Sequence, residues 1–161
     1  MSGTPRLSSH RTVLFLAALV FAGMLIPSRF AVTLTPSVDH RVFFLKYGPQ
    51  ENELKRGVYV LFDIRSEYID RGKAHTTIKR IACTGGERLL IRGAASYCEG
   101  RAIAVAKERS LQGETLPHFA YDGKIPDGAL FVTGQHRDSF DSRYFGFVQA
   151  KEVKALAYPI F

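Results

Sequence analysis

Short apolar runs alternate with glycine and proline breakers through most of this 161-residue chain, and few folds accommodate that spacing. The runs of strand-like composition are 42–45, 58–62, 76–81, 88–91, 103–105, 130–133 and 145–148. The breakers between them are Gly48-Pro49, Gly85-Gly86, Gly93, Gly100, Pro126-Asp127-Gly128 and Gly134. Many short strands joined by turns favour an all-β domain over a βαβ sheet. Between two of the runs, 105–116 is expected to form a loop or a short hairpin arm.

An uncharged apolar segment, 12–26, lies close to the N-terminus. Basic residues such as Arg6 and Arg11 precede it, and the first acidic residue of the chain is Asp39. This charge pattern is typical of a membrane segment whose N-terminus stays in the cytoplasm. A helix over 12–26 would span roughly 22 Å, less than the ~30 Å hydrocarbon core, and it reaches further if it continues to Val32.

Such a segment is either a cleaved signal peptide or a retained anchor. No convincing A-x-A cleavage site follows it, which favours the anchor. We therefore expect a cytoplasmic tail over 1–11, one N-terminal transmembrane helix over 12–32 and an exported, mainly β domain over 33–161. The link 29–36 alternates apolar residues and could begin a strand.

Charge and metal-ligand composition exclude several classes of function. The formal net charge is +7, but the basic residues are scattered and no zinc-finger or RNA-binding signature is present, so we expect no nucleic-acid partner. The five histidines show no metal-ligand spacing, and the two cysteines lack a nearby histidine pair, so we expect no metal and no cofactor. Cys83 and Cys98 form either a disulfide, if the domain is exported, or two buried free thiols.

Two residues, Ser37 and Lys79, suggest nucleophilic chemistry from their sequence context alone. Ser37 follows the apolar segment, and Pro36 stiffens the approach to it, although a serine after a proline is more often a turn residue. Lys79 lies inside the apolar run 78–81, where it points either to solvent, the commoner case, or inward. Burial would lower the pKa of an inward lysine and let it act as a general base for a serine hydroxyl. No Ser-His-Asp arrangement stands out, so a Ser-Lys pair is the simplest alternative.

The segment 134–146, GQHRDSFDSRYFG, is dense in hydrogen-bonding groups although strand-like runs flank it. Polar groups packed into a turn cost free energy unless they satisfy one another. Asp141 and Arg143 could form a charge-assisted pair that braces the turn. The alternative is a solvated loop.

These segments, in this order, resemble the motifs of the signal peptidase I family. The matching segments are 35–38 (TPSV), 56–62 (RGVYVLF), 78–81 (IKRI) continued by 86–88 (GER), and 138–146 (DSFDSRYFG). The last segment is the most specific, and the resemblance extends over about 33–148. It implies a mainly β, signal-peptidase-like domain that acts as a serine peptidase.

The resemblance also implies a role for each matching residue. Ser37 would be the nucleophile and Lys79 the general base. Ser139 would orient the lysine, and the Thr35 hydroxyl together with the Ser37 backbone N–H would form the oxyanion hole. Asp141 and Arg143 would hold the Ser139 turn in place.

Several departures point to one branch of the family. Val38 replaces the usual Met, 134–137 reads GQHR where the family has Gly-Asp-Asn-Arg, and 85–87 reads GGE where it has Pro-Gly-Asp. With the small size and the single expected anchor, these changes look most like the conjugal transfer (TraF-type) peptidases, which process a pilin subunit, in some cases with cyclisation. The partners implied are a membrane-embedded precursor and the lipid bilayer, with the catalytic domain in the periplasm of a bacterial inner-membrane protein.

Three other functions stay open. One is a general signal peptidase that cleaves many exported preproteins. Another is a catalytically inactive, membrane-tethered assembly factor that keeps the fold, which an intact Ser37, Lys79 and Ser139 set argues against. A Ser-Lys autoprotease of the repressor type shares this core fold, but it carries a DNA-binding domain where this chain has its apolar segment.

Overall fold

The computed structural model describes residues 11–17, 23, 29–33, 37–68 and 72–160. Residues 11–17 are helical and exposed. Within these described ranges, no helix is both long and apolar enough to cross a membrane. Of the transmembrane helix predicted over 12–32, residues 18–22 and 24–28 lie outside the described residues, so the helix stays a prediction.

Antiparallel strands are the main regular structure of the described part of the chain, which confirms the prediction of a mainly β domain. The strands are β1 (Phe30–Val32), β2 (Val42–Tyr47), β3 (Tyr59–Ile64), β4 (His75–Thr84), β5 (Arg88–Arg92), β6 (Ala95–Cys98), β7 (Arg101–Val105), β8 (Asp122–Lys124), β9 (Ala129–Thr133), β10 (Val148–Gln149) and β11 (Ala155–Pro159). Short helical turns are α2 (Ser142–Phe145), η2 (Glu51–Glu53) and η4 (Ala150–Glu152).

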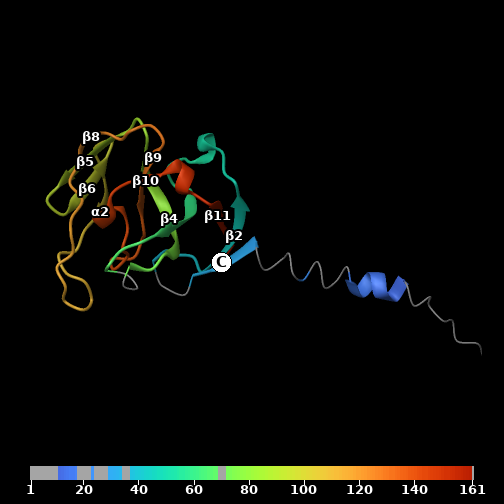
Figure 1. Cartoon of the computed structure of the whole chain (residues 1–161). Helices are drawn as coiled ribbons and strands as arrows, with labels where there is room; N and C mark the ends of the chain where they lie inside the picture. Colours follow the sequence, from blue (N-terminus) through green and yellow to red (C-terminus); the bar gives the residue numbers. More distant parts are fainter. Residues whose placement is uncertain (1–10, 18–22, 24–28, 34–36, 69–71, 161) are drawn as a thin grey trace, which may run out of the picture.

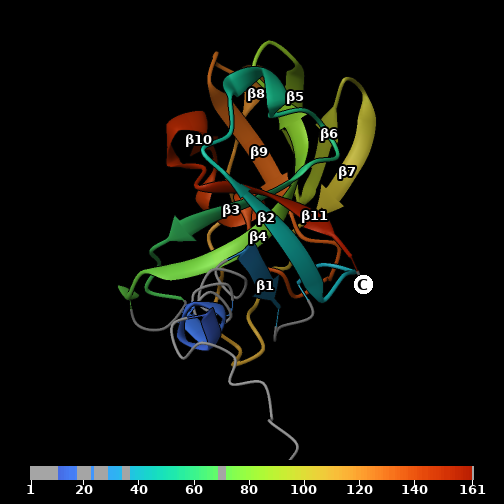
Figure 2. The same ribbon diagram turned by 90° about the vertical axis from the view of Figure 1, so that its right-hand side faces the viewer.

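The strands form two sheets. Among the described residues, the larger sheet has the order β1-β2-β11-β3-β4-β9-β10 and the smaller has the order β7-β6-β5-β8. Figure 1 shows the smaller sheet on one side of the molecule and β2 and β11 on the other, with β4 and β9 between them. In the perpendicular view, β9 rises from the larger sheet toward β5 and β8 (Figure 2).

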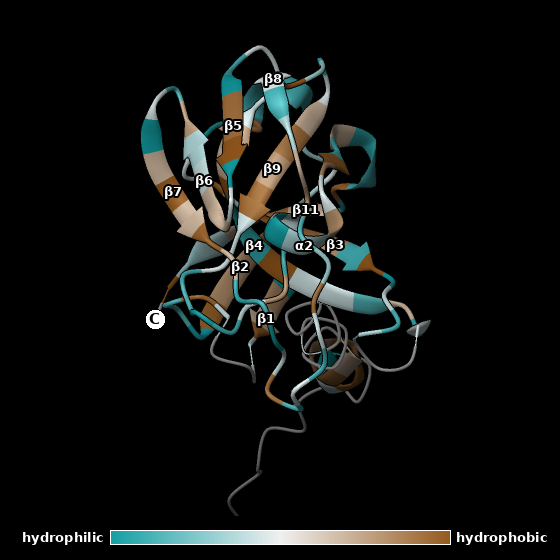
Figure 3. Ribbon diagram, turned by 90° about the vertical axis from the view of Figure 1, so that its left-hand side faces the viewer, coloured by the Kyte–Doolittle hydropathy of each residue, from teal (hydrophilic) through white to brown (hydrophobic). Residues whose placement is uncertain are grey.

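The larger sheet has apolar side chains on both faces. Along β3, Val60, Phe62 and Ile64 enter one buried cluster, whereas Tyr59 and Leu61 enter another. Successive side chains of a strand point to opposite faces, so a strand buried on both faces is largely apolar, and in β3 only Asp63 is exposed. The all-buried β9 is of the same kind, and Figure 3 shows it brown along nearly its whole length.

A third buried cluster lies at the junction of the two sheets. Phe131 of β9, Leu89 of β5 and the cysteines Cys83 and Cys98 are each fully buried in it. Because β4 belongs to the larger sheet and β6 to the smaller, this cluster holds the two sheets together.

Most predicted strands are confirmed, each within a few residues of the expected bounds, but the strand predicted over 145–148 is wrong. The chain forms α2 over Ser142–Phe145 and resumes pairing only at β10. Asp141 caps α2 by accepting a hydrogen bond from the Arg143 backbone N–H, and Gly146, at φ 85°, ends it. The local capping interactions override the strand-like composition of the segment.

The segment predicted as a loop or hairpin arm is a hairpin-like arm without regular strands. Arg109 and Thr115 form an isolated antiparallel bridge in it. The backbone N–H of Ser110 donates to Glu114 O at 2.8 Å, which closes the tip. We call residues 106–118 the arm. Its position matters because it forms one wall of the candidate active site.

Candidate active site

A cavity of about 450 Å³ brings together three of the residues expected to carry the chemistry, Ser37, Lys79 and Ser139. They come from separate parts of the chain: the segment after β1, the middle of β4 and the turn before α2. The arm closes one side of the cavity, where Lys107 and Leu116 are among the lining residues.

Lys79 faces this cavity because of its position in β4. His75, Thr77 and Lys79 alternate along the strand, and all three line the cavity, as the two-residue period of a strand requires. The Lys79 side chain is only 2% exposed. Of the two orientations open from the sequence, the structure therefore has the inward one.

The buried lysine has a strongly lowered basicity. Burial lowers the pKa of Lys79 from 10.5 to about 8, because an ammonium loses its hydration inside the protein. Two smaller effects oppose each other: the charge of Asp141 raises this pKa and that of Arg143 lowers it. The amine is thus partly neutral near physiological pH, as a general base must be.

Ser139 holds the end of the Lys79 side chain. The Lys79 Nζ donates a hydrogen bond to Ser139 Oγ at 2.8 Å, and both residues are buried. The flexible lysine stem is thereby directed to one position in the cavity.

Gly134 allows the Ser37 segment to approach the Ser139 turn. A Cβ built at Gly134 would overlap both Ser139 Oγ and the Ser37 carbonyl oxygen. The backbone N–H of His136 donates to Ser37 O at 3.4 Å, which joins the two segments. Only glycine fits at this crossing, whereas from the sequence Gly134 is predicted only to separate two strands.

Asp141 and Arg143 form a buried, two-point ion pair beneath the Ser139 turn. Arg143 Nε donates to Asp141 Oδ1 at 2.7 Å and Nη2 donates to Oδ2 at 2.6 Å. Arg143 Nη2 also donates to Ser139 O, and the Gly134 N–H donates to Asp141 Oδ2, each at 2.8 Å. The pair therefore fixes both sides of the Gly134–Ser139 turn, and the solvated-loop alternative is wrong.

Other expected residues lie elsewhere. Thr35, the expected oxyanion donor, lies outside the described residues. Tyr144, for which the sequence predicts no role, lines the cavity, and its hydroxyl accepts a hydrogen bond from the Lys107 backbone N–H at 2.9 Å. This bond attaches the arm to α2. An aromatic residue after Arg143 is the only signal of it in the sequence.

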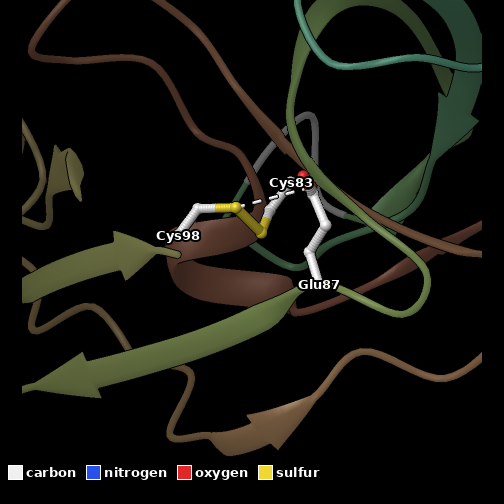
Figure 4. Close-up of side chains that lie close together, drawn as sticks. All are labelled: Cys83, Glu87 and Cys98. Atoms are coloured by element: carbon white, nitrogen blue, oxygen red, sulfur yellow. Dashed lines mark hydrogen bonds between the residues drawn. A yellow bond between two sulfur atoms is a disulfide. The ribbon is translucent and has the colours of Figure 1, made fainter. Parts of the chain in front are cut away.

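Cys83 and Cys98 form a disulfide, with Cα atoms 5.8 Å apart (Figure 4). Glu87 Oε2 lies 3.5 Å from Cys98 Sγ, and Arg56 pairs with the same carboxylate. Among the described residues, these two cysteines and Glu87 are the one group of potential metal-ligand side chains that lie close together. Both sulfurs are used in the disulfide, so the group offers no thiolate.

Three comparisons bear on the chain. The family described as "Signal peptidase, peptidase S26" matches residues 8–161. Signal peptidase I of Bacillus caldolyticus is 28% identical over 92 residues, which are 50% of this chain and 50% of that protein, so the chain spans about half the length of this curated relative. A crystal structure of a signal peptidase I from Enterococcus faecalis V583 has 23% sequence identity and a TM-score of 0.41, covering 69% of this chain and 98% of the other.

Proposed function

The chain belongs to the signal peptidase family, peptidase S26, and we propose that it is a membrane-bound serine endopeptidase that uses Ser37 as nucleophile and Lys79 as general base. The observation that carries this proposal is the buried Lys79, with its pKa lowered to about 8, in the cavity that Ser37 also lines. A serine hydroxyl needs such a base because its own pKa is far too high.

In the first half of the proposed reaction, Lys79 Nζ takes the Ser37 hydroxyl proton while Oγ attacks the scissile carbonyl carbon. The tetrahedral oxyanion accepts hydrogen bonds from the Ser37 backbone N–H and the Thr35 hydroxyl. The C–N bond then breaks, and the leaving amine takes the proton from Lys79. Ser139 keeps Nζ directed at the reacting atoms, since it already holds that nitrogen at 2.8 Å.

In the second half, water attacks the acyl-enzyme ester, and Lys79 accepts the proton of that water. The Ser37 oxygen leaves and regains a proton from Lys79. A cyclising enzyme would differ here, because an amine of the substrate itself would replace water as the attacking group.

We propose that the substrate is the precursor of an exported protein with a membrane-embedded segment, with a conjugative pilin subunit as the first candidate. The departures at Val38, 85–87 and 134–137 support the conjugal transfer branch. A general signal peptidase for exported preproteins is the second candidate, and the family match supports it equally.

We also propose that 12–32 anchors the chain in a bacterial inner membrane, with 1–11 in the cytoplasm and the catalytic domain in the periplasm. The basic residues before an uncharged apolar segment support this orientation. A periplasm-dependent reporter enzyme fused after residue 161 tests it: activity of the reporter supports the orientation and a lack of activity refutes it.

Co-expression with two substrates tests the proposed activity. A candidate prepilin and a generic preprotein are each expressed with the wild type, Ser37→Ala and Lys79→Ala, and the products are measured by mass spectrometry. Lys124→Ala, on the exposed strand β8, is the control for lysine removal. We expect processing by the wild type and the control but by neither site variant. Processing that survives both site substitutions would refute the Ser-Lys assignment. The chain would then be either an inactive scaffold, with another enzyme cleaving the precursor, or a peptidase with a different site.

A further inference from the structure

One further hollow adjoins the catalytic cavity, and a second hollow adjoins the first. The first, about 600 Å³, shares Lys107 and Arg109 with the catalytic cavity. The second, about 380 Å³, shares Val105 and Arg137 with the first. The three hollows therefore lie in a row, and the second reaches β4 at Arg80, on the face opposite Lys79.

Positive charge dominates the walls of the two further hollows. Their basic lining residues are Arg80, Lys107, Arg109, Arg137 and Arg143. We call these two hollows, with these five residues, the basic channel. Glu108 is the one acidic residue that lines it among those described.

Two of the five cations already have carboxylate partners. Lys107 pairs with Asp138, and Arg143 pairs with Asp141. Those pairs hold the arm and the Ser139 turn in place. The other three cations are Arg80, Arg109 and Arg137.

Arg80, Arg109 and Arg137 form no ion pair with any residue that the structure describes. Arg80 Nε donates only to a backbone carbonyl, that of Gly57, at 3.2 Å. Arg109 Nη1 likewise donates to Gly113 O at 3.3 Å. No described carboxylate lies within ion-pair distance of these exposed guanidinium groups, although Arg137 acts on Asp138 at longer range, and the net positive charge of the region favours a bound anion.

Arg143 also keeps a donor for a ligand. A guanidinium carries five N–H groups. Four are used: Nε and Nη2 on Asp141, Nη2 on Ser139 O, and Nη1 on Val105 O. The remaining Nη1 N–H has no hydrogen-bond partner among the residues that the structure describes, and it lies beside Val105, which lines both hollows of the basic channel.

We propose that the basic channel binds an acidic segment of the precursor polypeptide whose scissile bond is held at Ser37. Arginine side chains recognise carboxylates through paired hydrogen bonds, and several in neighbouring hollows suit a run of Asp or Glu. The first hollow shares Lys107 and Arg109 with the catalytic cavity, which favours a segment of the substrate chain over a separate ligand such as a lipid headgroup. This inference rests on the proposed function and adds a charge requirement to the substrate.

The test measures binding and needs no catalysis. Fluorescein-labelled hexaglutamate is titrated with the full chain in neutral detergent, and fluorescence anisotropy gives Kd. Labelled hexaglutamine and vesicles with and without anionic phosphatidylglycerol are measured in parallel. The variant Arg80→Gln/Arg137→Gln removes two exposed cations of the basic channel. Arg101→Gln is the matched control, since Arg101 is exposed and lines neither hollow.

We expect hexaglutamate to bind, hexaglutamine not to bind, and the double variant to raise Kd about tenfold or more, with Arg101→Gln within about twofold of the wild type. Equal effects of the double variant and of Arg101→Gln, or binding of hexaglutamine as tight as that of hexaglutamate, would overturn the proposal. A lack of hexaglutamate binding would also overturn the proposal, even if the anionic vesicles bind. The binding of hexaglutamate does not depend on Ser37. Processing of the precursor by Ser37→Ala would therefore refute the proposed function independently of the binding result.

Discussion

The Lys79 ammonium nitrogen lies 2.8 Å from the Ser139 hydroxyl oxygen, and both side chains are buried beside the same cavity. The hydrogen bond directs the amine, whereas burial sets its basicity. These two roles are separable by experiment, because a pH profile reports the basicity and the height of its plateau reports the orientation.

The activity should rise with pH through the pKa of Lys79. The base acts in its neutral form, and this pKa is lowered to about 8. We therefore expect kcat/KM for a peptide or precursor substrate to increase about tenfold per pH unit below 8 and to level off above it. The measurement is a kcat/KM profile from pH 6 to pH 10. A flat or falling profile between pH 6 and pH 8 would contradict the assignment of Lys79 as the base.

Ser139→Ala should lower the plateau of that profile and leave its midpoint near 8. The hydroxyl directs Nζ, but burial is the main cause of the lowered pKa. We expect kcat/KM to fall by up to about 10²-fold, within the range of general-base effects. The same pH series measures both quantities. A midpoint that moves toward 10.5 would show that Ser139 also sets the basicity.

Lys79→Met should stabilise the fold at pH 7. The pKa of Lys79 is about 10.5 in the unfolded chain and about 8 in the folded protein. The wild type is therefore least stable below pH 8, and its free energy of unfolding rises between pH 8 and about pH 10.5. A shift of this size corresponds to about 3 kcal/mol at most, less the lost hydrogen bond to Ser139. Urea denaturation at pH 7 and pH 10.5 measures the difference. An advantage of Lys79→Met that does not shrink at pH 10.5 contradicts the prediction.

Gly134→Ala should abolish activity through crowding. The added Cβ overlaps Ser139 Oγ and the Ser37 carbonyl oxygen, so it pushes the Ser37 segment away from the Ser139 turn that holds Lys79. We expect kcat/KM to fall by about 10²-fold or more, because such misplacement of reacting groups has that cost. Gly123→Ala is the control, since its nearest neighbour is a Tyr121 side-chain atom at 3.6 Å. Similar activity of the two variants would show that the crossing tolerates a side chain.

Asp141→Asn should destabilise the fold by about 3–5 kcal/mol, because it leaves the Arg143 charge buried without a partner. Thermal and urea denaturation measure this loss. Asp122→Asn is the control: its pair with Arg88 is 59% exposed on both sides, and we expect little or no change there. Equal stability of both variants would mean that the buried pair does not support the turn.

Cys83→Ser/Cys98→Ser should lower the free energy of unfolding by about 3 kcal/mol, the value for a loop closed over 15 residues. Guanidinium denaturation with and without a thiol reductant measures it. The reductant should affect the wild type and not the double variant. The reductant is used at a concentration that reduces the disulfide of the unfolded chain. If the free energy of unfolding of the wild type is then unchanged, the predicted contribution of the disulfide is contradicted.

The sequence alone determined most of the strands and the segments that meet at the site. Local composition predicts β2, β3, β4, β5, β7 and β9, because apolar and β-branched residues bounded by glycine have few alternatives. It does not predict β6, β8 or β11. Those strands contain Ala, Ser, Gly or Asp and become strands by pairing with neighbours; β11 lies between β2 and β3.

Only the tertiary structure decided which way Lys79 points, that Gly134 must be glycine, and that the arm closes the cavity. Burial is a property of contacts between distant segments, so a lysine in an apolar run fits either face of its strand until those contacts form. The sequence motifs indicated Ser37 and Lys79 as the candidate Ser-Lys pair. The packing of β4 against the Ser139 turn and the Ser37 segment decided the basicity of Lys79 and the position of its amine.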